Sequence, residues 1–400
     1  MSLINKSNDL VTAYMEYTKE SESPKRFLLW SALCGISAAA QRKIWIDWGD
    51  LRWYPNIFVI LAGPPATRKT TAMRDMRQFL IETGIPMSAD SITREKFIRR
   101  LGESTATVIT ENGNFLNHCS FALWSSELST LINKSTEQLL SDLTDLYDAP
   151  DKWEYDTKHQ GTDAIYGCYI TLLAATTPTS FRHSVPVAAV GSGFTSRVIF
   201  VCAKAKQQKS PCPLFASSIE GQEIKNFIMQ RLLNIYSSNG VFKGTKEFAE
   251  RYINLYAAMP DSPPFDPDNF SHYWDRRMQN LMKVSMLYAL SRGAGIDGKP
   301  HVLEVVDFDR ALETLKDAET EMPLVFADFG RSKVAWIVHK VLDVLKDYKN
   351  GMSLATLTKR MMRDVTSYEL SNVITTLESA QLITTKVTSG GTIVCLTTKK

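Results

Sequence analysis

The residues with the clearest chemistry lie in one loop, where Gly63 is followed, after five residues, by Lys69 and Thr70. The apolar run before the loop, residues 57–61, predicts a strand buried on both faces, and TTAMRDMRQFLIETG after it predicts a helix. In a P-loop of this form, backbone N–H groups face a polyphosphate, the lysine reaches its β and γ oxygens, and the threonine holds Mg²⁺. We therefore expect ATP and Mg²⁺ to bind at Gly63, Pro64, Pro65, Ala66, Thr67, Arg68, Lys69, Thr70 and Thr71.

Two positions of this loop depart from the usual pattern. Arg68 stands where a glycine normally precedes the lysine, and Ala66 occupies a second frequent glycine position. Both residues add a Cβ atom where backbone and phosphate approach closely. Pro64 and Pro65 stiffen the loop in place of the missing glycines. The alternative is an ordinary strand-to-helix turn with a chance Lys-Thr pair.

A candidate catalytic acid follows a second apolar strand. Residues 121–124 predict a strand, and Ser-Ser-Glu127 comes directly after it. A P-loop ATPase needs a carboxylate at the carboxyl end of a neighbouring strand to hold the Mg²⁺ shell or to polarise water. We expect Glu127 to activate water, with Ser126 in the place of the usual metal-side aspartate. Glu127 could instead be an acid near the start of the next helix, and Glu111 and Asp142 are the next candidates for the base.

Two further residues stand at strand ends. Thr177 follows the buried strand CYITLLAAT, where a polar side chain could sense the γ-phosphate. Arg197 precedes another apolar strand and could act as an arginine finger, either within its own chain or in a neighbouring subunit's site. The alternative for Arg197 is an ordinary ion pair with an acid.

The remaining patterns indicate an α/β protein of several domains. Helical periodicity over residues 8–41 predicts a collar, and four helices over 218–236, 245–258, 270–292 and 303–322 predict a helical lid. A hairpin around Gly161 has Lys158 and His159 at its tip; it could line the pore of a ring or simply lie on the surface. We expect a helical collar, a P-loop ATPase core, a helical lid and a winged helix, over residues 1–50, 51–210, 211–325 and 326–400.

The charge is concentrated at the carboxyl end of the chain. The whole chain of 400 residues has a net charge of only +3, but residues 331–400 hold eleven Lys and Arg against five Asp and Glu. Three helices and a β-hairpin in this stretch predict a winged helix-turn-helix. The third helix, which contains Tyr368 and Asn372 but no Arg or Lys, would read DNA with little base specificity, and Lys386, Lys399 and Lys400 would contact phosphates. Winged helices also mediate protein contacts.

Composition also limits where the protein is expected to act. The six cysteines are scattered without a C-x-x-C pair, which favours buried thiols in a reducing cytosol. The longest apolar stretch, residues 27–40, is too short to span a bilayer. We therefore expect a cytoplasmic protein, in the host cell if it is phage-encoded, with no membrane partner.

Taken together, these segments resemble a family of phage and plasmid helicase-like P-loop ATPases. The resemblance is carried by PNIFVILAGPPATRKT, the strand ending in SSE, the Thr-Thr-Pro strand end, GFTSRVIFV and KVSMLYALSRG, over roughly residues 20–320. The family is related to the virus-type primase-helicases of the RecA/AAA-like division. The resemblance implies a ring ATPase, which we expect to be a homohexamer, with Lys69, Thr70, Glu127 and Arg197 in the phosphate, metal, water-activating and finger positions.

The sequence and the resemblance together favour a DNA-dependent ATP hydrolase, a replicative helicase that moves along single-stranded DNA in its pore and contacts duplex at the winged helix. The resemblance also suggests a primase or polymerase as a partner, because members of the family are often fused to primases or encoded near them. Two alternatives stay open. One is a replication initiator or helicase loader that uses ATP as an assembly switch, and the other is a scaffold whose nucleotide site is inactive.

Overall fold

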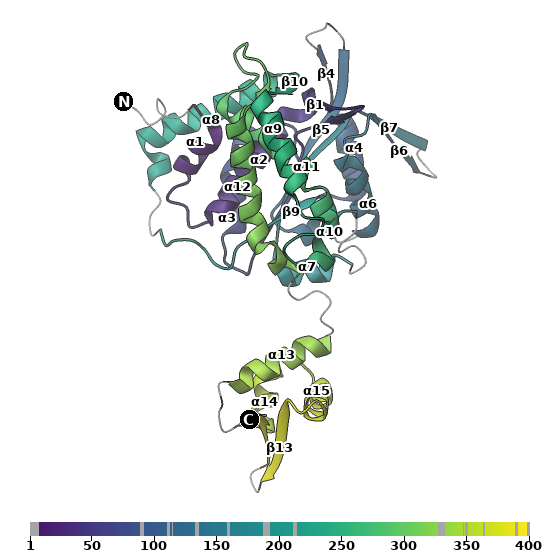
Figure 1. Cartoon of the computed structure of the whole chain (residues 1–400), viewed down its shortest axis with the longest axis vertical. Helices are drawn as coiled ribbons and strands as arrows, with labels where there is room; N and C mark the ends of the chain where they lie inside the picture. Colours follow the sequence, from purple (N-terminus) through teal and green to yellow (C-terminus); the bar gives the residue numbers. More distant parts are fainter. Residues whose placement is uncertain are drawn as a thin grey trace. The chain divides into compact units, whose positions relative to one another are not determined.

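The chain folds into two units, residues 1–327 and 328–400, and each is described by itself. Figure 1 shows the computed structural model, which has 15 α-helices among its described elements and both parallel and antiparallel strand pairs. The structure describes residues 8–88, 92–109, 113, 115–132, 136–157, 161–186, 193–210, 214–326, 333–346, 348, 351–362, 365–388 and 391–397.

A five-stranded sheet forms the centre of the first unit. Its strand order is β4-β5-β8-β3-β9, with β4 antiparallel to β5 and the other neighbours parallel. Every residue of β3, β8 and β9 is buried, which explains why these strands are continuous apolar runs. The strands are β3 (Phe58–Ala62), β4 (Thr105–Ile109), β5 (Phe115–Ser125), β8 (Cys168–Thr176) and β9 (Val198–Cys202).

Helix α2 (Lys25–Ala40) connects the sheet to the surrounding helices. It packs against β3 and β8 and also contacts α1 (Leu10–Tyr17) and α3 (Lys69–Glu82). Nearly all of its residues from Phe27 onward are buried, because other elements surround it on several sides. The first helix of the chain is therefore held close to the helix that begins at Lys69.

The segments predicted as collar and lid share a second sheet, of order β11-β10-β1-β2. β1 (Ile44–Trp48) forms a hairpin with β2 (Leu51–Trp53) and pairs in parallel with β10 (Gly240–Gly244), almost two hundred residues further along the chain. β10 in turn pairs with β11 (Val302–Leu303). The segments predicted as collar and lid are thus parts of one packed unit.

The described part of the segment predicted as a lid contains five α-helices where four were predicted. The prediction of one helix over 270–292 is wrong, because α10 ends at Asp275 and α11 begins at Arg277. At the junction the N–H of Arg276 donates to the carbonyl of Tyr273, three residues back, which tightens the turn and ends α10. The lid helices are α8 (Ile219–Ser237), α9 (Lys246–Ala258), α10 (Pro267–Asp275), α11 (Arg277–Arg292) and α12 (Val305–Glu321).

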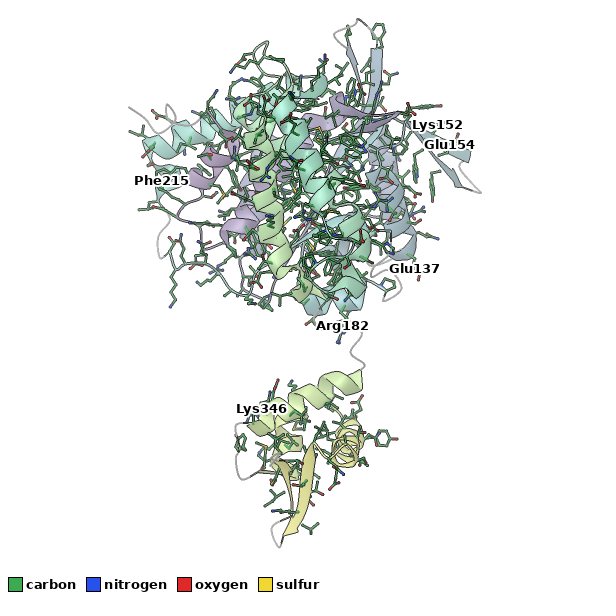
Figure 2. The ribbon with its side chains drawn as sticks, viewed as in Figure 1. Glu137, Lys152, Glu154, Arg182, Phe215 and Lys346 are labelled. Atoms are coloured by element: carbon green, nitrogen blue, oxygen red, sulfur yellow. The ribbon has the colours of Figure 1, made fainter. Side chains whose placement is uncertain are left out.

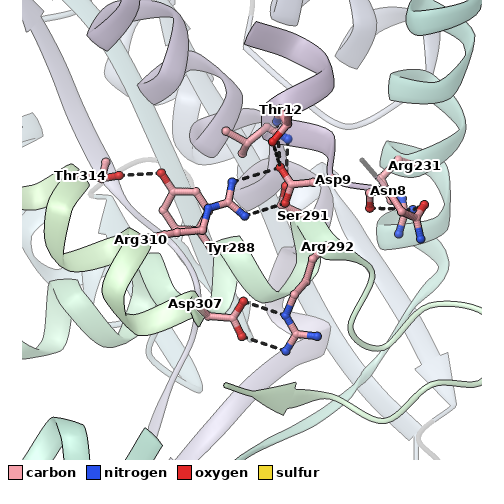
Figure 3. Close-up of polar contacts among 11 residues, drawn as sticks. Asn8, Asp9, Thr12, Arg231, Tyr288, Ser291, Arg292, Asp307, Arg310 and Thr314 are labelled. Carbon is pink, nitrogen blue, oxygen red and sulfur yellow. Dashed lines mark hydrogen bonds and ion pairs between the residues drawn. The ribbon is translucent and has the colours of Figure 1, made fainter. Parts of the chain in front are cut away.

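An ion pair fixes the start of α1 to the lid (Figure 3). Asp9 caps α1 by accepting from the N–H of Thr12, and Arg310 of α12 donates to both of its carboxylate oxygens, at 2.7 and 3.1 Å. The Arg310 guanidinium lies 4.2 Å from the ring centre of Tyr288 on α11. Burial raises the pKa of Asp9, but the hydrogen bonds and charge of Arg310 together with the hydrogen bonds from Thr12 outweigh burial, so this pKa is below its usual value.

The described part of the first unit also contains a two-stranded hairpin, four further α-helices and four 3₁₀ turns. β6 and β7 form the hairpin predicted around Gly161, and Figure 2 shows Lys152 and Glu154 on its first strand. These elements are α4 (Arg94–Glu103), α5 (Leu128–Ile132), α6 (Thr136–Tyr147), β6 (Lys152–Thr157), β7 (Gly161–Tyr166), α7 (Pro178–Ser184), and the 3₁₀ turns η2 (Gln41–Lys43), η4 (Thr195–Arg197), η5 (Phe215–Ser217) and η6 (Met322–Val325).

The described residues of the second unit form three helices and a three-stranded antiparallel sheet of order β12-β14-β13. Its apolar core includes Val341, Leu357, Val373 and Val394 from four different elements. Thr366 and Glu369 form a reciprocal capping box at the start of the third helix. The elements are α13 (Lys333–Lys346), β12 (Met352–Ser353), α14 (Leu354–Met361), α15 (Ser367–Ser379), β13 (Ile383–Thr388) and β14 (Gly391–Leu396).

Two expectations from composition can be compared with the described residues. Cys34, Cys119, Cys168 and Cys202 are buried free thiols and Cys395 is partly buried, whereas Cys212 lies outside the described residues. Within the described parts of the chain, we find no helix with the length and apolar character needed to cross a bilayer.

Candidate active site

The loop between β3 and α3 has an unusual backbone at the two positions where glycine was expected. Ala66 has φ of +67° and Arg68 has φ of +61°, both in the left-handed region. Residues with a Cβ atom normally avoid this region, at a cost of roughly 1–2 kcal/mol each. The loop therefore has glycine-type backbone conformations without the glycines.

Gly63 is required at the start of the loop because other atoms approach it closely. A Cβ atom at this position would lie 2.6 Å from the carbonyl oxygen of Ala203 and 3.0 Å from Oγ1 of Thr67. Its N–H donates to the carbonyl of Thr176, at 3.3 Å, which joins the end of β3 to the end of β8. The loop thus begins at a fixed point at the carboxyl edge of the sheet.

The side chain of Lys69 lies over this loop. Its Nζ atom donates to the carbonyl oxygens of Gly63 and Pro64, at 2.7 and 3.0 Å, and to Oγ1 of Thr67 at 3.2 Å. Burial lowers the pKa of Lys69, while the negative charge of Glu127 acts in the opposite direction. Thr70 is exposed in the first turn of α3, and within the described chain no side chain caps this helix. Open N–H groups at a helix start favour an anion.

Glu127 lies at the same edge of the sheet, just after β5. Its Oε1 atom accepts hydrogen bonds from Ser180 at 3.0 Å and Ser129 at 3.2 Å. Ser180 belongs to α7, so the carboxylate is held by the element that follows the neighbouring strand β8. Because β5, β8 and β3 are adjacent and parallel, their carboxyl ends lie side by side, as in other α/β ligand sites. Lys69 and Glu127 are therefore brought to one site.

The other two residues predicted at this edge have different surroundings. Thr177 caps α7, where its Oγ1 atom accepts from the N–H of Ser180 at 3.0 Å. Ser126 is exposed between β5 and Glu127. The structure thus places the predicted γ-phosphate sensor and the predicted metal-side residue beside Glu127.

An ion pair that the sequence did not predict fixes the loop to the segment between α1 and α2. Arg68 Nη2 lies 2.6 Å from Glu22 Oε2, and Lys206 Nζ lies 2.6 Å from Glu22 Oε1. Ser23 adds a hydrogen bond to the carbonyl of Arg68 at 3.0 Å. Lys206 and Arg68 lower the pKa of Glu22 to about 2. The sequence has no spacing signal for this contact, because Glu22 and Arg68 meet only in the folded chain.

Arg197 lies at the opposite edge of the sheet. β9 is parallel to β3, with Val198 opposite Phe58 and Cys202 opposite Ala62, so Arg197 precedes the strand while Gly63 follows its partner. Five residues of strand separate the two edges by about 16 Å.

Within its own chain, Arg197 is paired with an acid. Its Nη2 atom lies 2.6 Å from Oδ2 of Asp148, and Arg276 approaches the other oxygen of the same carboxylate at 3.5 Å. The Nε atom of Arg197 is buried and has no hydrogen-bond partner among the described residues. Two guanidinium groups thus share one carboxylate, and Asp148 is half exposed.

The remaining candidates are distributed as follows. Asp142 forms a two-point ion pair with Arg94, at 2.6 and 3.0 Å, which leaves it poorly placed to act as a base. Lys386 is exposed on β13. The predicted residues Glu111, Lys158, His159, Lys399 and Lys400 lie outside the described residues.

Metal binding would depend on few protein ligands here. Among the residues that the structure describes, no group of three or more His, Cys, Asp or Glu side chains could hold a metal ion. Mg²⁺ in nucleotide sites is commonly held by one or two protein ligands together with phosphates and water. The exposed Thr70 hydroxyl and Glu127 are compatible with that kind of site.

Comparison of the sequence with protein-family models gives no match, and comparison with curated proteins gives none either. The function must therefore be inferred from the residues and their arrangement.

Proposed function

We propose that this chain is a P-loop ATPase that assembles into a ring and moves along single-stranded DNA as a replicative helicase. The observation that carries the proposal is the loop at residues 63–70. Lys69 lies over it at an uncapped helix start, and Ala66 and Arg68 have the backbone conformations that glycines have in such loops. A loop that needed only to turn a strand into a helix would have no reason to retain two left-handed residues at a cost in stability.

In this proposal each residue of the site has one task. Backbone N–H groups and Lys69 bind the phosphates of ATP, and Thr70 holds Mg²⁺ with Ser126 nearby. Glu127 orients and activates water, in a position fixed by Ser180 and Ser129. Thr177 senses the γ-phosphate from the side.

Arg197 supports assembly into a ring. It lies about 16 Å across the sheet from its own loop, so only a neighbouring subunit's nucleotide is within its reach. In the proposed ring, Arg197 leaves Asp148 and stabilises the charge that develops on the γ-phosphate of that nucleotide.

The second unit supports binding to DNA. Its three helices and antiparallel sheet have the element order of a winged helix, and the exposed face of α15 carries Tyr368, Ser371 and Asn372. This polar, uncharged face favours binding with little base specificity, in keeping with a motor that moves along many sequences.

The central experiment compares ATP hydrolysis in the parent protein, Lys69→Ala and Glu127→Gln, with and without single-stranded DNA. We expect no turnover in Lys69→Ala, and we expect Glu127→Gln to retain ATP while losing at least about 100-fold in rate. Glu137→Gln, an exposed acid on α6 (Figure 2), is the matched control and should hydrolyse ATP like the parent. Parent-like turnover in Lys69→Ala would disprove the assignment of the loop.

A second candidate function is a replication initiator or helicase loader that uses ATP as an assembly switch. Ser126 favours it, because it leaves the site without the usual metal-side carboxylate, and a switch tolerates slow hydrolysis. Strand displacement on a forked duplex separates the two functions. A motor unwinds DNA in proportion to the ATP that it consumes, whereas a loader does not. A scaffold with an inactive site would show no change in particle size with ATP.

A further inference from the structure

We propose that the ribose and base of the bound nucleotide occupy a cavity of about 350 Å³ between residues 17–22 and the first two turns of α3. This inference rests on the proposed function, because it takes the phosphates to be bound by the loop at residues 63–70. The volume lies within the range of small-molecule sites. The chemical class of the ligand is then a ribonucleoside triphosphate.

The cavity adjoins the loop directly. Arg68, which directly precedes α3, and Thr71, in the first turn of α3, both line it. The ammonium group of Lys69 lies over the beginning of the loop, where it contacts the carbonyl oxygens of Gly63 and Pro64. If Lys69 binds the terminal phosphates, the α-phosphate lies toward Thr71 and the nucleoside extends beyond it.

Asp75 is in position to accept hydrogen bonds from the ribose. It follows Thr71 by four residues, so it lies on the same helix face one turn, about 5.4 Å, further along. Its side chain is partly exposed and is paired with Arg74, at 3.1 Å. A carboxylate only accepts hydrogen bonds and has about four lone-pair sites, so positions remain for the two hydroxyl groups of a ribose. An inorganic phosphate chain has no pair of sugar hydroxyl groups to donate to this carboxylate.

The other acids of the cavity are already engaged. Glu20 accepts from the N–H of Phe215 at 2.8 Å, and Glu22 is paired with Arg68 and Lys206. Tyr17 adds an aromatic surface for a base, and its ring is supported by Phe79, with 5.5 Å between ring centres. The cavity thus has one acid for the sugar and one ring for the base.

The test compares three ligands, each with Mg²⁺: ATP, 2′,3′-dideoxy-ATP and inorganic tripolyphosphate, measured by calorimetry. We expect the parent protein to bind ATP about tenfold more tightly than the dideoxy nucleotide, and tripolyphosphate more weakly still. Asp75→Asn should reduce the preference for ATP over the dideoxy nucleotide to less than about threefold. Its affinity for tripolyphosphate should stay unchanged or rise, because a negative charge near the anion has been removed.

Two further variants separate a local effect from a general one. Asp309→Asn makes the same change at an exposed position on α12, paired with Arg251, and should keep the parent preference for ATP. Ser21→Trp, which fills the cavity, should weaken ATP binding and leave tripolyphosphate binding intact. Equal affinities of the parent for ATP and tripolyphosphate, or a full ribose preference in Asp75→Asn, would overturn this inference while the loop assignment stood. Failure of all three ligands to bind would instead refute the proposed function.

Discussion

Nη2 of Arg68 lies 2.6 Å from Oε2 of Glu22, so the loop beside Lys69 is tied to the segment between the first two helices of the chain. Glu22 also binds Lys206, which follows β9. The acid thus holds two cations near the start of α3, where the proposed phosphates would also attract them. Glu22 and a bound nucleotide therefore compete for the same positive charge.

This competition predicts that Glu22→Gln binds ATP more tightly. Loss of the negative charge removes repulsion of the phosphates and frees Arg68 to turn toward them. Since an exposed ion pair is worth about 0.2–1 kcal/mol, we expect the affinity to rise by up to about fivefold. Calorimetric titration with ATP and Mg²⁺ measures the change, with Asp309→Asn as the charge-matched control. Weaker binding by Glu22→Gln would mean that Glu22 positions Arg68 for the nucleotide.

The left-handed backbone of Arg68 leads to a prediction about stability. At φ of +61° a glycine is unstrained, whereas an arginine is not. We expect Arg68→Gly to leave the free energy of unfolding unchanged or to raise it by up to about 1 kcal/mol, since the lost pair with Glu22 is partly exposed. Lys316→Gly, at an exposed position inside α12, should lower it by about 1 kcal/mol. Equal losses in both variants, measured by chemical denaturation, would contradict this account of the loop.

The position of Arg197 predicts that a complete site needs two subunits. Lys69→Ala lacks the phosphate-binding lysine and Arg197→Ala lacks the finger, so each variant alone should be inactive. In an equal mixture that exchanges subunits at random, about one quarter of the interfaces combine an intact Lys69 with an intact Arg197 from the neighbour. We therefore expect the mixture to regain ATPase activity. A mixture as inactive as its components, with subunit exchange verified by fluorescence, would show that Arg197 does not act in trans.

Lys283 has a buried amino group, and its protonation makes the stability of the folded protein depend on pH. Its Nζ atom donates to Asn56 at 2.8 Å and lies 3.9 Å from the ring centre of Tyr147. Burial lowers the pKa of Lys283 to about 7. The negative charge of Asp148 raises this pKa, whereas the positive charges of Arg276 and Arg197 lower it further. Between this pKa and the ordinary value of 10.5, the unfolded chain binds more protons than the folded chain. Stability should therefore rise with pH in this window and be lost as the pH falls toward 7.

We expect Lys283→Met to remove this dependence. The difference in unfolding free energy between the parent and Lys283→Met should shift in favour of the parent by on the order of 2 kcal/mol or more from pH 7.5 to 9.5. Urea denaturation at several pH values measures it. A difference that stays constant across this range would mean that Lys283 is already protonated in the folded protein throughout.

Local patterns predicted most of the individual elements. The apolar runs at β3, β8 and β9 could be identified because strands buried on both faces contain little else. The break between α10 and α11 was missed, because the helical periodicity continues through Arg276 and the tight turn there has no proline or glycine.

Contacts between distant parts of the chain could not be predicted in this way. The parallel pairing of β1 with β10 unites the predicted collar and lid, yet neither strand indicates its partner. The ion pairs of Glu22 with Arg68 and of Asp148 with Arg197 could not be predicted either, because single charged residues have no periodic pattern that indicates their partners. The sequence therefore indicated Lys69 and Glu127 for the candidate site, while the acids that pair with Arg68 and Arg197 emerged only from the fold.

From the surface of the second unit we expect Lys386 to contribute weakly to DNA binding and equally for duplexes of different sequence. Lys386 is exposed on β13, and the exposed side chains near the start of α15, such as Tyr368 and Asn372, carry no positive charge. A lysine that contacts only phosphate contributes affinity without sequence preference. We expect Lys386→Glu in the full chain to weaken binding to duplexes of unrelated sequence by the same factor. It should also reduce the slope of log K against log salt concentration by about one.

Asn372→Ala serves as the comparison, because a side chain that reads bases would alter the ranking of sequences and leave the salt slope unchanged. If Lys386→Glu binds every duplex as the parent does at all salt concentrations, β13 does not contact DNA, and a protein-binding role for this unit would account better for its surface.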